Sequence, residues 1–169
     1  MFGDLKRSRI IALSAAFIAL ISLGSWVSVP FFPVPLTLQT LFVLLAGAVM
    51  CRYAVIPVTL YLLLGALGLP VFHNGIAGLG ILLGPTGGYL FGFIPAALIV
   101  GLAYEAKSAR VHVIGLAIAT LIIYICGISW LMYSTGMGIA AALAMGMLPF
   151  LLGDVIKASA AYMIAKRLP

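Results

Sequence analysis

Apolar residues occur along this 169-residue chain in long continuous runs, and short segments rich in proline, glycine or charge separate them. The runs do not alternate as the strands of a membrane barrel would, so helices are the predicted spanning elements. A spanning helix needs about 20 apolar residues. We therefore predict one all-α membrane domain, residues 1–169, built as a bundle of six transmembrane helices. The helices are expected at about residues 10–27, 36–50, 54–68, 88–104, 111–130 and 150–165.

Composition supports an integral membrane protein. The chain is 65% hydrophobic and only 7% charged, whereas a soluble domain has roughly 25% charged residues. A multi-pass protein of the cell membrane is therefore expected. The net charge of +6 does not indicate a nucleic-acid partner, because the basic residues flank apolar runs and form no patch with interleaved aromatic side chains.

The basic residues also predict the orientation of the bundle. Eight of the nine lie before the first run, after the last run or in two of the breaks: Lys6, Arg7, Arg9, Arg52, Lys107, Arg110, Lys166 and Arg167. With six spans, all eight fall on one side of the membrane. The other three connections, residues 28–35, 69–87 and 131–149, contain no Lys or Arg. The positive-inside rule then places both termini in the cytoplasm and these three connections outside.

The three outer connections differ in character. Residues 28–35 contain three prolines and cannot be helical. Residues 69–87 are long, apolar and rich in glycine, so we expect them to fold back over the outer end of the bundle as a lid. The third connection is expected to carry a short surface helix at residues 139–147, and the last spanning helix should begin near Pro149.

Asp154 and Lys157 are the only charged side chains inside a long apolar run. Being three residues apart, they share one face of a helix. Two interpretations remain open from the residues alone. The charges neutralise each other and staple the bundle, or they are the polar contacts of a ligand. Their depth near the outer surface, beneath the glycine-rich connection, favours the ligand site.

Motifs for covalent chemistry are missing. The segment Gly84-Pro85-Thr86-Gly87-Gly88 lacks both the spacing and the lysine of a phosphate-binding loop. The two histidines, His73 and His112, are expected on opposite sides of the membrane, so we predict no metal site. No cofactor is expected either. Binding or transport is therefore predicted, and not an enzyme.

A few uncharged residues are further candidates. Trp26 and Tyr89 lie near outer helix ends, where an interfacial belt is the simpler explanation and a pocket the alternative. Gln39 needs a polar partner inside its apolar run. Small residues recur four apart in the first run, as Ala12 and Ala16 and as Ala15 and Ala19. This pattern permits close helix contact, either within the bundle or with another membrane protein.

Three blocks of the chain together resemble one family, the biotin-specific S components of energy-coupling factor (ECF) transporters, the BioY family. The blocks are residues 24–47, residues 65–90, which include the specific run Leu83-Gly84-Pro85-Thr86-Gly87-Gly88-Tyr89, and Pro149 to Lys157. The resemblance implies a six-helix subunit that captures its vitamin at the outer face. It also implies a transmembrane coupling subunit and two cytoplasmic ATPase subunits as partners.

The resemblance further implies that biotin lies between outer helix ends and loops, with Asp154 and Lys157 as polar contacts. An ionised Asp154 can only accept, and is assigned to a ureido N–H; Lys157 can only donate, either to the ureido oxygen or to the carboxylate. Gln39 is a further candidate contact, and Asn74 could add a ureido hydrogen bond. The apolar slot is expected to be lined by Trp26, Phe72, Leu79 and Tyr89. The pair His73-Asn74 departs from the small residues expected there.

Two other functions remain as alternatives. In the first, the chain is a stand-alone transporter whose Asp154/Lys157 pair carries protons, and it would take up vitamin without a coupling subunit. In the second, it is a structural membrane subunit, which would bind no vitamin at all.

Overall fold

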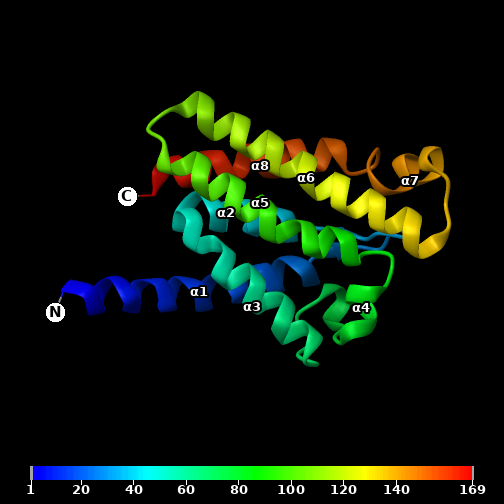
Figure 1. The fold of residues 1–169 in the computed structure, drawn as a ribbon, viewed down its shortest axis with the longest axis horizontal. Coiled ribbons are helices and arrows are strands. Elements are labelled where there is room, and N and C mark those ends of the chain that lie inside the picture. The colour runs from blue at the N-terminus through cyan, green and yellow to red at the C-terminus, as the bar shows by residue number, and fades with distance from the viewer. Residues whose placement is uncertain (1, 169) are drawn as a thin grey trace.

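The computed structural model describes the backbone of residues 2–168 and the side chains of residues 6–168, and it is helical almost throughout (Figure 1). The α-helices are α1 (Phe2–Trp26), α2 (Gln39–Met50), α3 (Val55–Ala66), α4 (Leu79–Leu83), α5 (Gly87–Glu105), α6 (Ala109–Thr135), α7 (Ile139–Gly146) and α8 (Leu151–Arg167). Two short 3₁₀-helices, η1 (Cys51–Ala54) and η2 (His73–Gly75), lie in connections.

The proline-rich connection after α1 is not helical, as the sequence predicted. Two short strands, β1 (Ser28–Val29) and β2 (Leu36–Thr37), pair antiparallel at its ends. Each of the six predicted helices overlaps an observed one, and the expected surface helix is α7. The glycine-rich connection is more structured than expected, because it contains η2 and α4. Helix α3 ends at Ala66, before the predicted residue 68, since Gly68 adopts a left-handed φ of 103°.

Figure 1 places both chain ends at one end of the bundle. The turn at η1 and the short connection between α5 and α6 lie at the same end, while the β1–β2 ribbon, α4 and α7 lie at the opposite end. At the terminal end, Arg52 of η1 pairs with Glu105 at the end of α5, with Nη2 2.6 Å from Oε2. The arrangement therefore separates the basic connections from the proline- and glycine-rich ones.

Helices α2 and α3 form an antiparallel hairpin. The side chain of Gln39, at the start of α2, hydrogen-bonds to Tyr61 in the second half of α3, and the chain reverses at η1. Each of these helices has 12 residues and is about 18 Å long. Among the described residues 2–168, four helical segments are long and apolar enough to cross a membrane, or five if α7 and α8, bent by 51°, count as one. That count treats α2 and α3 together, Gln39–Ala66, as a single span. Six crossings therefore remain a prediction.

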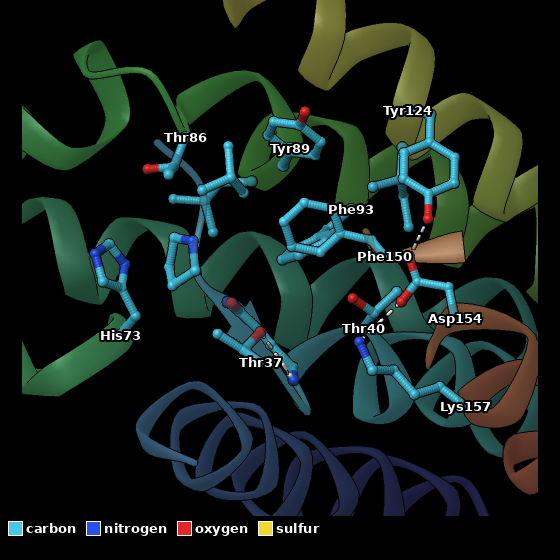
Figure 2. Close-up of a pocket in the computed structure, with 15 residues that line it drawn as sticks. Thr37, Thr40, His73, Thr86, Tyr89, Phe93, Tyr124, Phe150, Asp154 and Lys157 are labelled. Carbon is cyan, nitrogen blue, oxygen red and sulfur yellow. Dashed lines mark hydrogen bonds and ion pairs between the residues drawn. The ribbon is translucent and has the colours of Figure 1, made fainter. Parts of the chain in front are cut away.

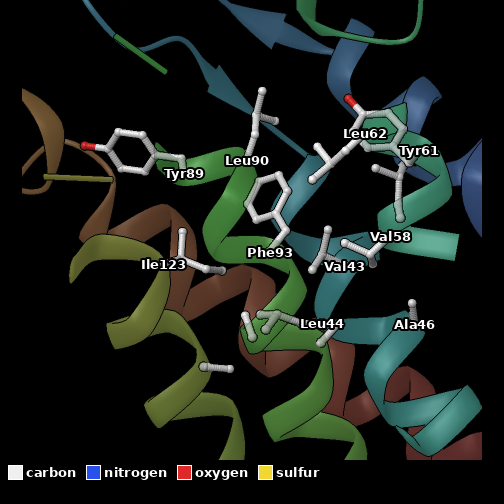
Figure 3. Packing of buried hydrophobic residues seen from close by; sticks show 14 of the residues in the cluster. Val43, Leu44, Ala46, Val58, Tyr61, Leu62, Tyr89, Leu90, Phe93 and Ile123 are labelled. Carbon is white, nitrogen blue, oxygen red and sulfur yellow. The ribbon is translucent and has the colours of Figure 1, made fainter. Parts of the chain in front are cut away.

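The core of the bundle is built around α2 and α5. Helix α2 contacts α1, α5 and α8, and α5 contacts α2, α3 and α6. Figure 3 shows side chains of α2, α3, α5 and α6 meeting in this core, among them Val43, Leu44, Val58, Phe93 and Ile123. The pocket lies at the end of this core that is opposite the chain termini.

Candidate ligand-binding pocket

A pocket opens between the first residues of α8, the middle of α6, the N-terminal turns of α2 and α5, and the connections at residues 28–35 and 69–87. It encloses about 60 Å³, counted as the volume open to the centre of a water molecule, so it is narrow. Its lining combines one ion pair with threonine, aromatic and aliphatic side chains: Val34, Pro35, Thr37, Gln39, Thr40, His73, Thr86, Tyr89, Leu90, Phe93, Ile123, Tyr124, Phe150, Asp154 and Lys157.

Asp154 and Lys157 form the charged side of the pocket (Figure 2). Both are buried, with exposed fractions of 7% and 8%. Lys157 Nζ donates to Asp154 Oδ1 over 2.8 Å, and the hydroxyl of Tyr124 donates to Asp154 Oδ2. The first turn of α8 contains Asp154, where the helix dipole favours a negative charge. A buried carboxylate is thus held by two donors while it still faces the pocket.

Tyr124 was missed by sequence reasoning. It lies in the apolar run of α6, 30 residues before Asp154, and no spacing rule connects the two. The one available signal was a phenol group within an apolar span, which usually needs a polar partner when buried. The sequence patterns also did not single out Thr37, Thr40, Phe93, Ile123 or Phe150.

Tyr124 and Asp154 also line a second space. This mainly apolar crevice lies between α6 and α8, encloses about 340 Å³ on the same measure, and includes Thr120, Ser159 and Tyr162. The same two side chains therefore border the polar pocket on one side and the crevice on the other. The contact between Tyr124 and Asp154 forms part of the wall that divides them.

The opposite side of the pocket is formed by the glycine-rich connection. Figure 2 shows His73 and Thr86 there, facing the charged side across an apolar middle that includes Phe93. The imidazole of His73 is partly buried, and this desolvation lowers its pKa. His73 is therefore a neutral hydrogen-bonding group near pH 7.

This shift predicts a pH effect on stability. Folding lowers the pKa of His73 from its ordinary 6.5, so the unfolded chain binds the proton more readily. The contribution of His73 to the free energy of unfolding is therefore complete above pH 6.5. It is lost as the pH falls through the pKa that His73 has in the folded protein. We expect the melting temperature in detergent to fall less between pH 7.5 and pH 5 for His73→Gln than for the wild type. Parallel curves for the two proteins would contradict the effect.

Two other predicted contacts line the pocket and are held by hydrogen bonds. Gln39 Nε2 donates to the hydroxyl of Tyr61 over 2.7 Å, and that hydroxyl donates to the carbonyl of Val71 over 3.0 Å. The hydroxyl of Tyr89 donates to the carbonyl of Gly146 over 2.8 Å, which ties α5 to α7. Of the eight predicted ligand contacts, the structure thus brings Asp154, Lys157, Gln39 and Tyr89 together around one space.

The other four predicted contacts lie outside the lining. Trp26 is 49% exposed, and its Nε1 donates to the carbonyl of Pro70 over 3.0 Å. Phe72 is 1% exposed and packs edge-on against Tyr61, in a space that Gly65 leaves open. Asn74 is exposed and accepts a hydrogen bond from Ser28, and Leu79 is 61% exposed. Their contact with a ligand stays a prediction.

The small residues of α1 face outward. Ala12, Ala15, Ala16 and Ala19 are all exposed, so this stripe does not pack within the bundle. The sequence left two uses open, contact within the bundle and contact with another membrane protein. The exposed stripe is available for the second. Among the described side chains, no group of three His, Cys, Asp or Glu residues comes together as metal ligands.

A profile of the BioY family matches residues 3–169. The chain is 45% identical to a biotin transporter BioY of Thermotoga maritima over 90% of either chain. It is 40% identical to a probable biotin transporter BioY of Pyrococcus horikoshii, over 96% of this chain and 97% of the relative.

A solved structure is also similar. It is a crystal structure of the S-component for biotin from an ECF-type ABC transporter, with a TM-score of 0.87 and 26% sequence identity. The similarity covers 97% of this chain and 92% of the other. The likeness therefore extends over the whole bundle, including the end where the pocket lies.

Proposed function

Because the chain belongs to the BioY family, we propose that it is the S component that captures biotin outside the cell and delivers it through an ATP-driven ECF transporter. It is a multi-pass membrane protein and not an enzyme, in keeping with its transporter relatives.

One observation carries the choice of ligand: a buried carboxylate and a buried ammonium, braced by Tyr124, line a pocket with an apolar middle. The ureido ring of biotin has two N–H donors and one carbonyl acceptor. An ionised Asp154 accepts from one of the N–H groups, while Lys157 donates to the ureido oxygen or to the valerate carboxylate. The aromatic and aliphatic lining, including Phe93 and Ile123, suits the fused rings.

The pocket is narrow relative to biotin. A volume of about 60 Å³ for water centres is roughly four to six water-sized positions, which is too little for two fused rings and a five-carbon chain. We therefore expect side chains or connections around it to move apart when biotin enters. The two outer connections, which contribute Val34, Pro35, His73 and Thr86, are the segments with the fewest helical constraints.

We propose six crossings with both termini in the cytoplasm. The hairpin of α2 and α3 would supply two of them, and α7 with α8 one. The eight basic residues outside the pocket all lie at the terminal end of the bundle, which the positive-inside rule places in the cytoplasm. The pocket then opens toward the outside.

A stand-alone proton-coupled transporter is less well supported. The buried charge of Asp154 is already accounted for by the donors Lys157 and Tyr124, one at each carboxylate oxygen, without a role in carrying protons. The similar solved structure is moreover described as a component of an ECF-type ABC transporter. Uptake of biotin by this chain in a host without any coupling subunit would favour the stand-alone transporter.

A direct binding measurement tests the proposal. The purified protein in detergent is titrated with biotin, thiamin and riboflavin by calorimetry, and any small molecule that co-purifies is identified by mass spectrometry. We expect tight binding of biotin and none of the other two vitamins. Binding of either other vitamin in place of biotin, or of none of the three, would contradict the assignment.

The alanine stripe of α1 is proposed to dock the coupling subunit. We expect Ala16→Trp to abolish co-purification with that subunit and to leave biotin binding unchanged, because the bulky ring prevents close helix approach. Leu121→Trp, at an exposed position of α6, is the matched control and should keep the complex intact. Loss of biotin binding along with the partner would instead assign the stripe a role in the fold.

A further inference from the structure

A groove lies between the N-terminal half of α1 and the start of α3. Figure 1 shows this part of α1 running away from the rest of the bundle. The groove encloses about 650 Å³, measured as above. Its lining is basic at one end and mainly apolar along its length: Lys6, Arg7, Ile10, Ile11, Ser14, Ala15, Ile18, Tyr53, Ile56 and Leu60.

The lining of the groove changes from basic to apolar along its length. Lys6 and Arg7 lie at the open end of α1, and Tyr53 of η1 lies at the end of the bundle where the chain termini are. Isoleucine and leucine side chains of α1 and α3 continue the walls toward the middle of the bundle. An occupant that matches both parts has an anionic head and a long apolar tail.

The groove face of α1 differs from the alanine stripe. At 100° per residue, Arg7, Ile11, Ser14 and Ile18 gather on one side of the helix, whereas Ala12, Ala16 and Ala19 gather on nearly the opposite side. Ala15 lies at the border. The groove is lined by branched side chains, which hold a partner helix away but leave irregular space that a flexible acyl chain fills.

We propose that this groove binds an anionic glycerophospholipid. The phosphate lies between Lys6 and Arg7, and the hydroxyl of Tyr53 is available to donate to it. One acyl chain lies along Ile10, Ile18 and Leu60. The proposed orientation of the bundle assigns this lipid to the cytoplasmic leaflet. The site is independent of the biotin pocket.

The test uses the full-length protein in nanodiscs of phosphatidylcholine with a minor fraction of phosphatidylglycerol, and native mass spectrometry counts the lipids that remain bound. We expect the wild type to retain phosphatidylglycerol selectively. The variant Lys6→Gln/Arg7→Gln should lose that preference by roughly 10- to 30-fold, as expected from two charge contacts. Ile56→Trp, which fills the apolar part without changing the charge, should also release the lipid.

The control is Lys166→Gln/Arg167→Gln, which removes the same charge at the same end of the bundle but outside the groove. Its lipid preference should equal that of the wild type. An equal loss in this control would overturn the site, because the preference would then be a general effect of surface charge. Unchanged lipid retention in both groove variants, with a cross-link from Ile56→Cys to the coupling subunit, would instead make the groove a protein-docking surface.

Discussion

Replacing Asp154 with asparagine is expected to weaken biotin binding at least about 100-fold, which corresponds to about 2.7 kcal/mol. The carboxylate accepts from Tyr124 and from Lys157, and in the proposed complex also from a ureido N–H. An asparagine keeps the shape but presents an amide N–H₂ to at least one of these donors. It also leaves the ammonium of Lys157 buried without its counter-ion, and losses of about 2–5 kcal/mol are typical of such changes. Calorimetric titration of the purified variant measures the effect.

The same substitution also affects folding, so a second variant separates the two effects. Removing one member of a buried ion pair costs about 3–5 kcal/mol, whereas replacing both with uncharged residues is often neutral. Asp154→Asn/Lys157→Met should therefore recover most of the melting temperature that Asp154→Asn loses, but none of the biotin affinity. Wild-type affinity in Asp154→Asn would remove this carboxylate from the site. Recovered affinity in the double variant would restrict the pair to a structural role.

Replacing Gly88 with alanine is expected to destabilise the bundle by about 1–3 kcal/mol, the usual cost of overpacking a dense interface. Gly88 lies in the first turn of α5, where α5 contacts α6. A Cβ atom added there would come within 2.2 Å of Trp130 Cβ and 2.4 Å of the carbonyl oxygen of Cys126. Neither neighbour is the flexible end of a side chain, so the two helices would have to separate. Thermal unfolding in detergent measures the loss.

Gly153→Ala is the matched control for Gly88→Ala. Gly153 is also a helical glycine and directly precedes Asp154, but nothing lies within 4 Å of the position of an added Cβ. Alanine is favoured over glycine in a helix by about 1 kcal/mol, so this variant should melt at or slightly above the wild-type temperature. A drop equal to that of Gly88→Ala would contradict the packing argument and indicate a general cost of side chains at these glycines.

The helices and the charged side of the pocket could be predicted from the sequence for physical reasons. Long continuous apolar runs are typical of membrane-spanning helices, and charges inside them are costly enough to stand out. Asp154 and Lys157 are therefore conspicuous in the sequence itself. Gln39 stands out for a related reason, because an amide in an apolar run needs a partner, and Tyr61 is that partner.

Other members of the pocket could not be found in this way. The phenol of Tyr124 resembles an ordinary core or interfacial side chain until its distance to Asp154 is known. Trp26 and Phe72 were predicted to line the pocket but lie outside its lining. An aromatic residue near a helix end can turn toward a pocket, a loop or the core. Trp26 turns to the carbonyl of Pro70, and Phe72 fills the space beside Gly65. These directions depend on tertiary contacts.

The short hairpin of α2 and α3 has a consequence for the lipid around the protein. Each of its helices is about 18 Å long, against a hydrocarbon layer of about 30 Å, while α6 has 27 residues. If both short helices cross the membrane, the bilayer beside them must become thinner, whereas the bilayer beside α6 need not. The protein would then sit in a bilayer of uneven thickness, and shorter acyl chains would gather along its α3 flank.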